Sequence, residues 1–189
     1  MLRTAALGSV LALALAAGAS ASLVAALDMR QLVERADRVA VVQVVAQATQ
    51  QDDRSRIVTD VTLEVLEPLA GGAASGERFT LVRLGGAVGD VGMRVEGEPG
   101  FQDGARYLVF ARRWRGEGAA ALYRPVGMSQ GVMRVQQQNG QDVVLPGGAG
   151  LALVQPVGGR LQAAPAAITA PRTLDAVLGE IRALLGEAR

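Results

Sequence analysis

The residues that most suggest catalysis are Gly127, Ser129 and Gly131, which match the G-x-S-x-G pattern of a serine nucleophile elbow. In hydrolases this serine lies on a sharp strand-to-helix turn and passes its proton to a histidine. The chain contains no His and no Lys, so both a Ser-His and a Ser-Lys arrangement are excluded. Residues 127–131 also lie between two predicted strands. We therefore interpret the two glycines as shaping a bend or bulge.

Four carboxylates, those of Asp90, Glu96, Glu98 and Asp103, lie within the Gly-rich residues 87–105 and are the candidate ligands for a hard cation such as Ca²⁺. Their spacing matches neither an EF-hand loop nor a nonapeptide repeat. Zinc and copper sites are usually built from Cys and His, and the chain has neither. We interpret the four as solvated loop charges and expect no metal and no other cofactor.

A local cluster of basic and aromatic residues is the candidate binding surface, formed by Arg112, Arg113, Trp114 and Arg115. Such a patch can contact nucleic acid, a polyanion or an acidic protein surface. The other interpretation is a solvated strand end in which Trp114 covers the core and the arginines discourage edge-to-edge pairing. Strand alternation predicts Arg113 and Arg115 on one face and Arg112 and Trp114 on the other.

The pattern of the first 21 residues predicts a cleavable signal peptide. Arg3 precedes an uncharged run that extends to Leu27, and Ala19 and Ala21 provide the small residues that signal peptidase needs. A retained membrane anchor is the alternative, because about 20 apolar residues span a bilayer. The Ala, Gly and Ser content makes this run weakly hydrophobic and favours cleavage. We expect an exported bacterial protein, periplasmic or extracellular, with no stable membrane span after cleavage.

The composition of the mature chain limits its partners and its means of stabilisation. Removing residues 1–21 leaves 168 residues (189 minus 21), which is enough for one domain. Loss of Arg3 leaves 18 basic against 18 acidic residues (19 minus 1), so there is no general attraction to nucleic acid or anionic lipid. Without Cys the domain forms no disulfides, and packing must stabilise it.

Alternating apolar residues and turn signals predict a mainly β chain of about six or seven strands. The predicted strands cover residues 38–48, 56–66, 78–84, 106–114, 121–126, 131–135 and 142–145, and residues 151–154 are a further candidate for a short strand. Asp28 and Gln31 form a capping box for a short N-terminal helix, and an amphipathic helix follows Thr173. We expect the apolar stripe of the second helix to pack on the sheet and not on a partner.

The fold class expected from these elements is a small antiparallel OB-like barrel or sandwich with two flanking helices. The predicted organisation has four parts: signal peptide 1–21, β-barrel domain with leading helix 22–150, Gly/Ala/Pro-rich linker 151–172, and C-terminal helix 173–189.

Several landmarks resemble those of uncharacterised exported bacterial proteins. The most distinctive is the run at residues 97–110, GEPGFQDGARYLVF, followed by GMSQG at 127–131; LV at 32–33, ADRV at 36–39, IVT at 57–59, VLE at 65–67 and LGG at 84–86 precede them. The resemblance implies a closed OB-like barrel, similar to the inhibitory domain of tissue inhibitors of metalloproteinases and to netrin-like modules. Those inhibitors chelate zinc through an N-terminal Cys, which this chain lacks, so only the architecture carries over.

The function predicted from the sequence is an exported, non-enzymatic domain that binds another exported or envelope protein. One alternative is a hydrolase or lyase that uses carboxylates and a divalent cation in residues 87–105. A second alternative is a protease inhibitor that inserts a loop. Clustered carboxylates would favour the enzyme, and an exposed apolar loop or sheet face would favour the binding module or the inhibitor.

Overall fold

The structure, a computed structural model, describes residues 22–187, so the predicted signal peptide lies outside the described residues. Within this range it contains thirteen strands, two α-helices and two short 3₁₀ helices. None of the helices between residues 22 and 187 is long and apolar enough to cross a membrane. The chain is therefore mainly β, as the sequence predicts.

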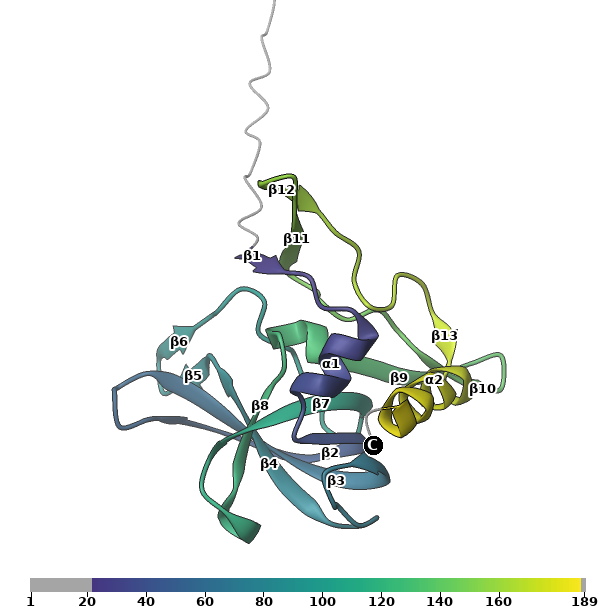
Figure 1. The fold of residues 1–189 in the computed structure, drawn as a ribbon. Coiled ribbons are helices and arrows are strands. Elements are labelled where there is room, and N and C mark those ends of the chain that lie inside the picture. The colour runs from purple at the N-terminus through teal and green to yellow at the C-terminus, as the bar shows by residue number, and fades with distance from the viewer. Residues whose placement is uncertain (1–21, 188–189) are drawn as a thin grey trace, which may run out of the picture.

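Eight strands form one sheet in the order β13-β10-β9-β7-β2-β3-β4-β8 (Figure 1). Their bounds are β2 (Arg38–Gln51), β3 (Ile57–Ala70), β4 (Arg78–Leu84), β7 (Arg106–Arg115), β8 (Leu122–Pro125), β9 (Val132–Gln138), β10 (Gln141–Val144) and β13 (Arg172–Thr173). All seven strands predicted from alternation are present in this sheet. The predicted boundaries differ mainly in two places: β2 extends three residues further towards the β2–β3 turn, and β3 extends four residues further at its C-terminal end.

Five strands of this sheet form a ring, because β8 pairs with both β4 and β7. Around the ring the order is β2, β3, β4, β8, β7, and β7 pairs with β2 to complete it. The β4–β8 pairing is parallel, so the prediction of a purely antiparallel arrangement is wrong. The reason is topological. In the chain β7 follows β4 and runs antiparallel to β8, so β8 runs in the same direction as β4 when it pairs with it.

Residues 38–44 of β2 and 107–111 of β7 are almost all buried, on both faces, which explains the Val-rich sequence of the first half of β2. Val42 and Val109 belong to the core inside the ring, together with Leu63 of β3. Val41 and Phe110 point the opposite way and belong to a second core beneath the helices. One continuous pair of strands thus separates two apolar cores.

The two helices, α1 (Met29–Arg35) and α2 (Leu174–Glu187), cover the second core (Figure 1). The predicted capping box is confirmed: the Gln31 N–H donates to Asp28 at 2.8 Å, and the Asp28 N–H donates to Gln31 Oε1 at 3.0 Å. The apolar stripe of α2 packs on this core through four buried side chains, Leu174, Val177, Leu178 and Ile181. The stripe is therefore an intramolecular contact, as predicted.

The hairpin between β9 and β10 turns at Asn139 and Gly140, as predicted. Their φ angles are 51° and 79°, and positive φ at both central residues is typical of a type I′ turn. The Asn-Gly pair is favoured here because both residues tolerate this conformation.

A separate three-stranded sheet has the order β1-β11-β12, with β1 (Ser22–Ala25) parallel to β11 (Leu151–Val157) and β12 (Arg160–Ala163) antiparallel to it. Residues 151–172, predicted as a linker, therefore contain two of its strands. A further hairpin, β5 (Gly86–Val88) and β6 (Val91–Met93), lies in the Gly-rich passage. These short strands bring the count above the predicted six or seven, because their Gly, Ala and Pro content hides any alternation.

Candidate functional site

The serine of the G-x-S-x-G match lies in a buried turn, and both its hydroxyl and its backbone N–H donate hydrogen bonds to backbone carbonyls. Ser129 lies in the 3₁₀ helix η2 (Met128–Gly131) between β8 and β9. Its Oγ donates to the carbonyl of Ala149 at 2.9 Å, and its N–H donates to the carbonyl of Gly97 at 2.9 Å. The segment follows a strand but leads into another strand, so it lacks the geometry of a nucleophile elbow. The interpretation as a bend is confirmed.

The neighbouring Gln130 is a structural residue that the sequence reading did not single out. It is buried, its Oε1 accepts from the Leu27 N–H at 2.9 Å, and its Nε2 donates to the Ala25 carbonyl at 3.1 Å. These bonds hold the N-terminal segment beside η2. Only the position of Gln130 within a Gly-flanked motif distinguished it from the other glutamines in the sequence.

The four candidate metal ligands are not brought together. Asp90 is exposed between β5 and β6, while Asp103 accepts from Gln47 Nε2 at 2.8 Å. Glu96 pairs with the exposed Arg94 at 2.7 Å. Among residues 22–187 there is no group of three or more His, Cys, Asp or Glu side chains placed to hold a metal ion. The Gly-rich passage therefore does not assemble the cation site considered from the sequence.

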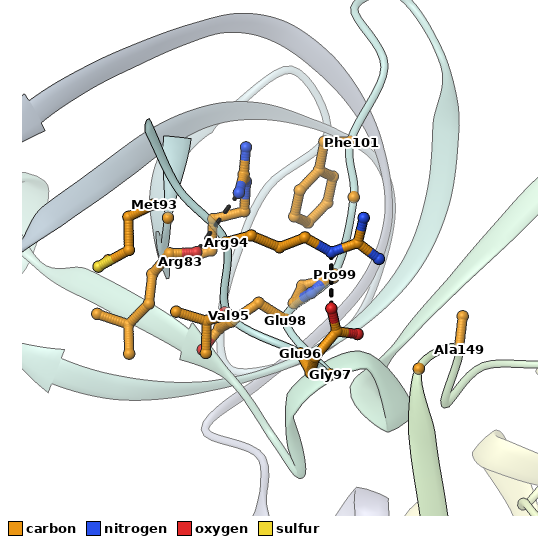
Figure 2. A pocket seen from close by; sticks show the side chains of 14 residues that line it. Arg83, Met93, Arg94, Val95, Glu96, Gly97, Glu98, Pro99, Phe101 and Ala149 are labelled. Atoms are coloured by element: carbon orange, nitrogen blue, oxygen red, sulfur yellow. Dashed lines mark hydrogen bonds and ion pairs between the residues drawn. The ribbon is translucent and has the colours of Figure 1, made fainter. Parts of the chain in front are cut away.

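Glu98 differs from the other three acids because it is largely buried beside two arginines. It lines a depression of about 370 Å³ together with Arg83 and the Arg94–Glu96 pair (Figure 2). Its Oε2 is buried without a hydrogen-bond partner, and so are Arg83 Nε and Arg124 Nη2. Burial raises the pKa of Glu98, and the Leu84 N–H and the two guanidinium groups only partly offset this effect.

Replacing Glu98 by Gln is expected to stabilise the protein at neutral pH. The folded-state pKa lies above the ordinary value of 4.5, so ionisation above that pH favours the unfolded chain. The increase in the free energy of unfolding should shrink as the pH falls from about 7 towards about 4. Urea unfolding of the Glu98→Gln protein at several pH values measures it, with Glu96→Gln in its exposed ion pair as the control. A less stable Glu98→Gln protein at pH 7 would show that pairing with the arginines dominates.

The basic cluster predicted at the end of β7 forms a stack around Trp114. The Arg124 guanidinium carbon lies 3.9 Å from the centroid of the Trp114 ring and that of Arg115 lies 4.3 Å from it. We call these three residues the Trp114 stack. Such contacts combine cation–π attraction with packing of the planar guanidinium. The sequence indicated two members, and Arg124 was missed because it lies on the neighbouring strand β8.

The predicted alternation of the cluster is wrong because β7 contains a bulge. The β7–β8 register pairs Arg113 with Tyr123 and Arg115 with Leu122, which leaves Trp114 as the extra residue. Residues opposite each other in a ladder share a face, so Arg115 is on the face of Arg112 and not on that of Arg113. The bulge thereby gathers arginines on one side of the β7–β8 hairpin.

The Trp114 stack adjoins the tip of the long β2–β3 hairpin. Arg115 Nη2 lies 3.5 Å from the Asp53 carboxylate, in a pair whose two side chains are about half exposed. Burial lowers the pKa of Arg124, and the positive charge of the nearby Arg56 lowers it further. Arg56 is paired with Asp52 at 2.6 Å. The stack is therefore a cationic surface placed between two connecting loops of the ring.

No family model, no curated protein sequence and no solved structure matches this chain.

Proposed function

We propose that this chain is an exported, non-enzymatic module that binds another exported or envelope macromolecule, and that its five-stranded ring is an OB-like barrel. We number the five strands of the ring in chain order, so that β2, β3, β4, β7 and β8 are strands one to five. Their order around the ring is then 1-2-3-5-4, and strands three and five are parallel. This order supports the proposed five-stranded OB-like barrel. The resemblance of the sequence to exported bacterial proteins with such a barrel supports the same assignment.

The observation that carries the binding proposal is the Trp114 stack and its place in the ring. OB-folds bind oligomeric ligands at the loops that join the first to the second and the fourth to the fifth strand. Here these loops are the β2–β3 and β7–β8 connections, and the Arg115–Asp53 pair links them. Arginine and tryptophan are enriched at the centres of protein interfaces. The ligand expected at this surface carries carboxylates or other anionic groups.

Two observations favour a binding module over an enzyme. Ser129 is buried and bonded within a turn, and the chain has no histidine to activate it. Glu96 and Glu98 both line the depression, but Glu96 is held in an ion pair with Arg94 at 2.7 Å, which leaves Glu98 as the one lining carboxylate outside an ion pair. A single carboxylate does not provide the acid and base pair that carboxylate-dependent hydrolysis needs.

A capture experiment with matched charge reversals tests the binding proposal. Protein beginning at Ser22 is immobilised and exposed to envelope and medium fractions of the source organism, and bound proteins are identified by mass spectrometry. We expect one reproducible partner whose recovery falls at least tenfold with Arg115→Glu, because the reversal repels an anionic ligand. Arg160→Glu makes the same charge change on the exposed strand β12 and should leave recovery unchanged. Equal recovery with both variants, or no partner, would contradict the proposal.

A further inference from the structure

Two neighbouring depressions border residues 25–27 beside α1, and we call them together the groove. Their volumes are about 180 Å³ and 410 Å³, and both are lined by Ala25, Leu27 and Arg35. The remaining walls are mostly small and apolar, and they include Val24, Pro125, Val126, Pro156, Pro165 and Ala167. The groove is separate from the Glu98 depression.

Two exposed arginines that form no ion pair in the described residues border this groove. Arg35 and Arg112 both line the smaller depression. Within the part of the chain that the structure describes, neither side chain forms an ion pair or a hydrogen bond. The one carboxylate in the lining, Asp28, accepts from the Gln31 N–H in the cap of α1. Asp28 keeps its negative charge, so the two arginines and Asp28 give the lining a net charge of +1 (2 minus 1).

We propose that this groove binds an extended acidic segment of an exported partner protein, with carboxylates on Arg35 and Arg112. Charge complementarity selects an anionic occupant, and guanidinium groups pair well with carboxylates. The small apolar side chains of the walls leave room for an extended backbone. Walls without aromatic rings are unsuited to stacked bases.

This inference rests on the proposed function and names the chemistry of its partner. Arg112 lies opposite Arg124 in the β7–β8 register, so the groove begins beside the Trp114 stack. A partner that crosses the stack can continue into the groove along β1. The two surfaces share no side chain, since Arg112 lines the groove and Arg115 and Arg124 contact Trp114. They can therefore be altered separately.

Fluorescence anisotropy with a labelled peptide of alternating Glu and Ala tests the groove, using the protein from Ser22 to Arg189. We expect saturable binding that weakens about tenfold in the Arg35→Gln/Arg112→Gln double variant, because two exposed ion pairs are lost. An otherwise identical peptide with Lys in place of Glu should not bind. Both arginines are exposed, so circular dichroism and urea unfolding should match the wild type.

The control variant Arg115→Gln separates the groove from the Trp114 stack. Peptide affinity that falls with Arg115→Gln but not with the double variant would overturn the groove and leave the proposed function intact. Absence of binding to the wild-type protein would also overturn the groove, while the capture experiment decides the proposed function independently. A dimer in sedimentation experiments that the double variant abolishes would assign the groove to a second copy of the chain and overturn the acidic partner.

Discussion

Replacing Gly131 by Ala is expected to destabilise the fold by about 3 kcal/mol, the upper end of the usual cost of overpacking. A Cβ atom at this position would lie 2.4 Å from the carbonyl oxygen of Val126 and 2.9 Å from that of Phe110. Both contacts are with backbone, and the Val126 N–H donates to the Phe110 carbonyl at 2.9 Å. The crowded atoms are thus fixed by the β7–β8 pairing and cannot move aside without breaking it.

Urea unfolding of the Gly131→Ala protein measures the effect as a lower transition midpoint. Gly100→Ala is the matched control, because nothing lies within 4 Å of a Cβ atom built there. We expect this variant to stay within about 0.5 kcal/mol of the wild type. Equal stability of the two variants would show that the G-x-S-x-G segment does not need glycine for close packing.

The role of the G-x-S-x-G segment could be predicted from the sequence only in part. The missing histidine was sufficient to reject a nucleophile at Ser129, and the flanking strands indicated a bend. The contacts that require the glycine come from Val126 and Phe110, and the latter is distant in sequence. Nothing in the local sequence around Gly131 indicates that the carbonyl of Phe110, on strand β7, packs against it.

Local signals predicted the elements well where side-chain periodicity was strong. The Asn139–Gly140 turn and the Asp28–Gln31 capping box depend on residues that are neighbours in the chain. Of the β1-β11-β12 sheet, the sequence indicated only the start of β11 at residues 151–154, because the surrounding Ala, Gly and Pro residues show no period of two. Its formation depends on pairing Ser22–Ala25 with residues about 130 positions away, which a local pattern does not reveal.

The candidate sites depended on tertiary contacts in the same way. Four acids in one loop looked equivalent in sequence, but burial raises the pKa of Glu98 and leaves its Oε2 without a hydrogen-bond partner. The basic cluster was found by its composition, whereas the bulge at Trp114 reversed the face expected for Arg115. A bulge adds one residue to a strand, so every side chain beyond the bulge lies on the face opposite to the one that simple alternation predicts.

Arg38→Ala is expected to lower the free energy of unfolding by about 3 kcal/mol, although a charged residue is removed. Arg38 is 9% exposed and lies at the start of β2, on the side that faces the ring interior. Its guanidinium carbon lies 4.9 Å from the ring centroids of both Phe79 and Tyr123. Truncation would leave these two aromatic rings without the group that packs between them and would open one end of the core inside the ring.

Arg78→Ala is the matched control, because Arg78 pairs with Glu64 at 2.9 Å much as Arg38 pairs with Glu77 at 3.0 Å. The Arg78 side chain is 60% exposed, and we expect its loss to cost less than about 1 kcal/mol. A small effect for both variants would contradict the assignment of Arg38 as a core residue.

Arg38→Met separates packing from charge at the same position. Methionine retains a long flexible stem between the aromatic rings but removes the ion pair with Glu77 and the buried Nε that has no hydrogen-bond partner. Replacement of a buried ion pair by a well-packed apolar side chain is often close to neutral. We therefore expect Arg38→Met to be closer in stability to the wild type than to Arg38→Ala. If Arg38→Met is as unstable as Arg38→Ala, the guanidinium stabilises this end of the ring through its charge and not through its packing.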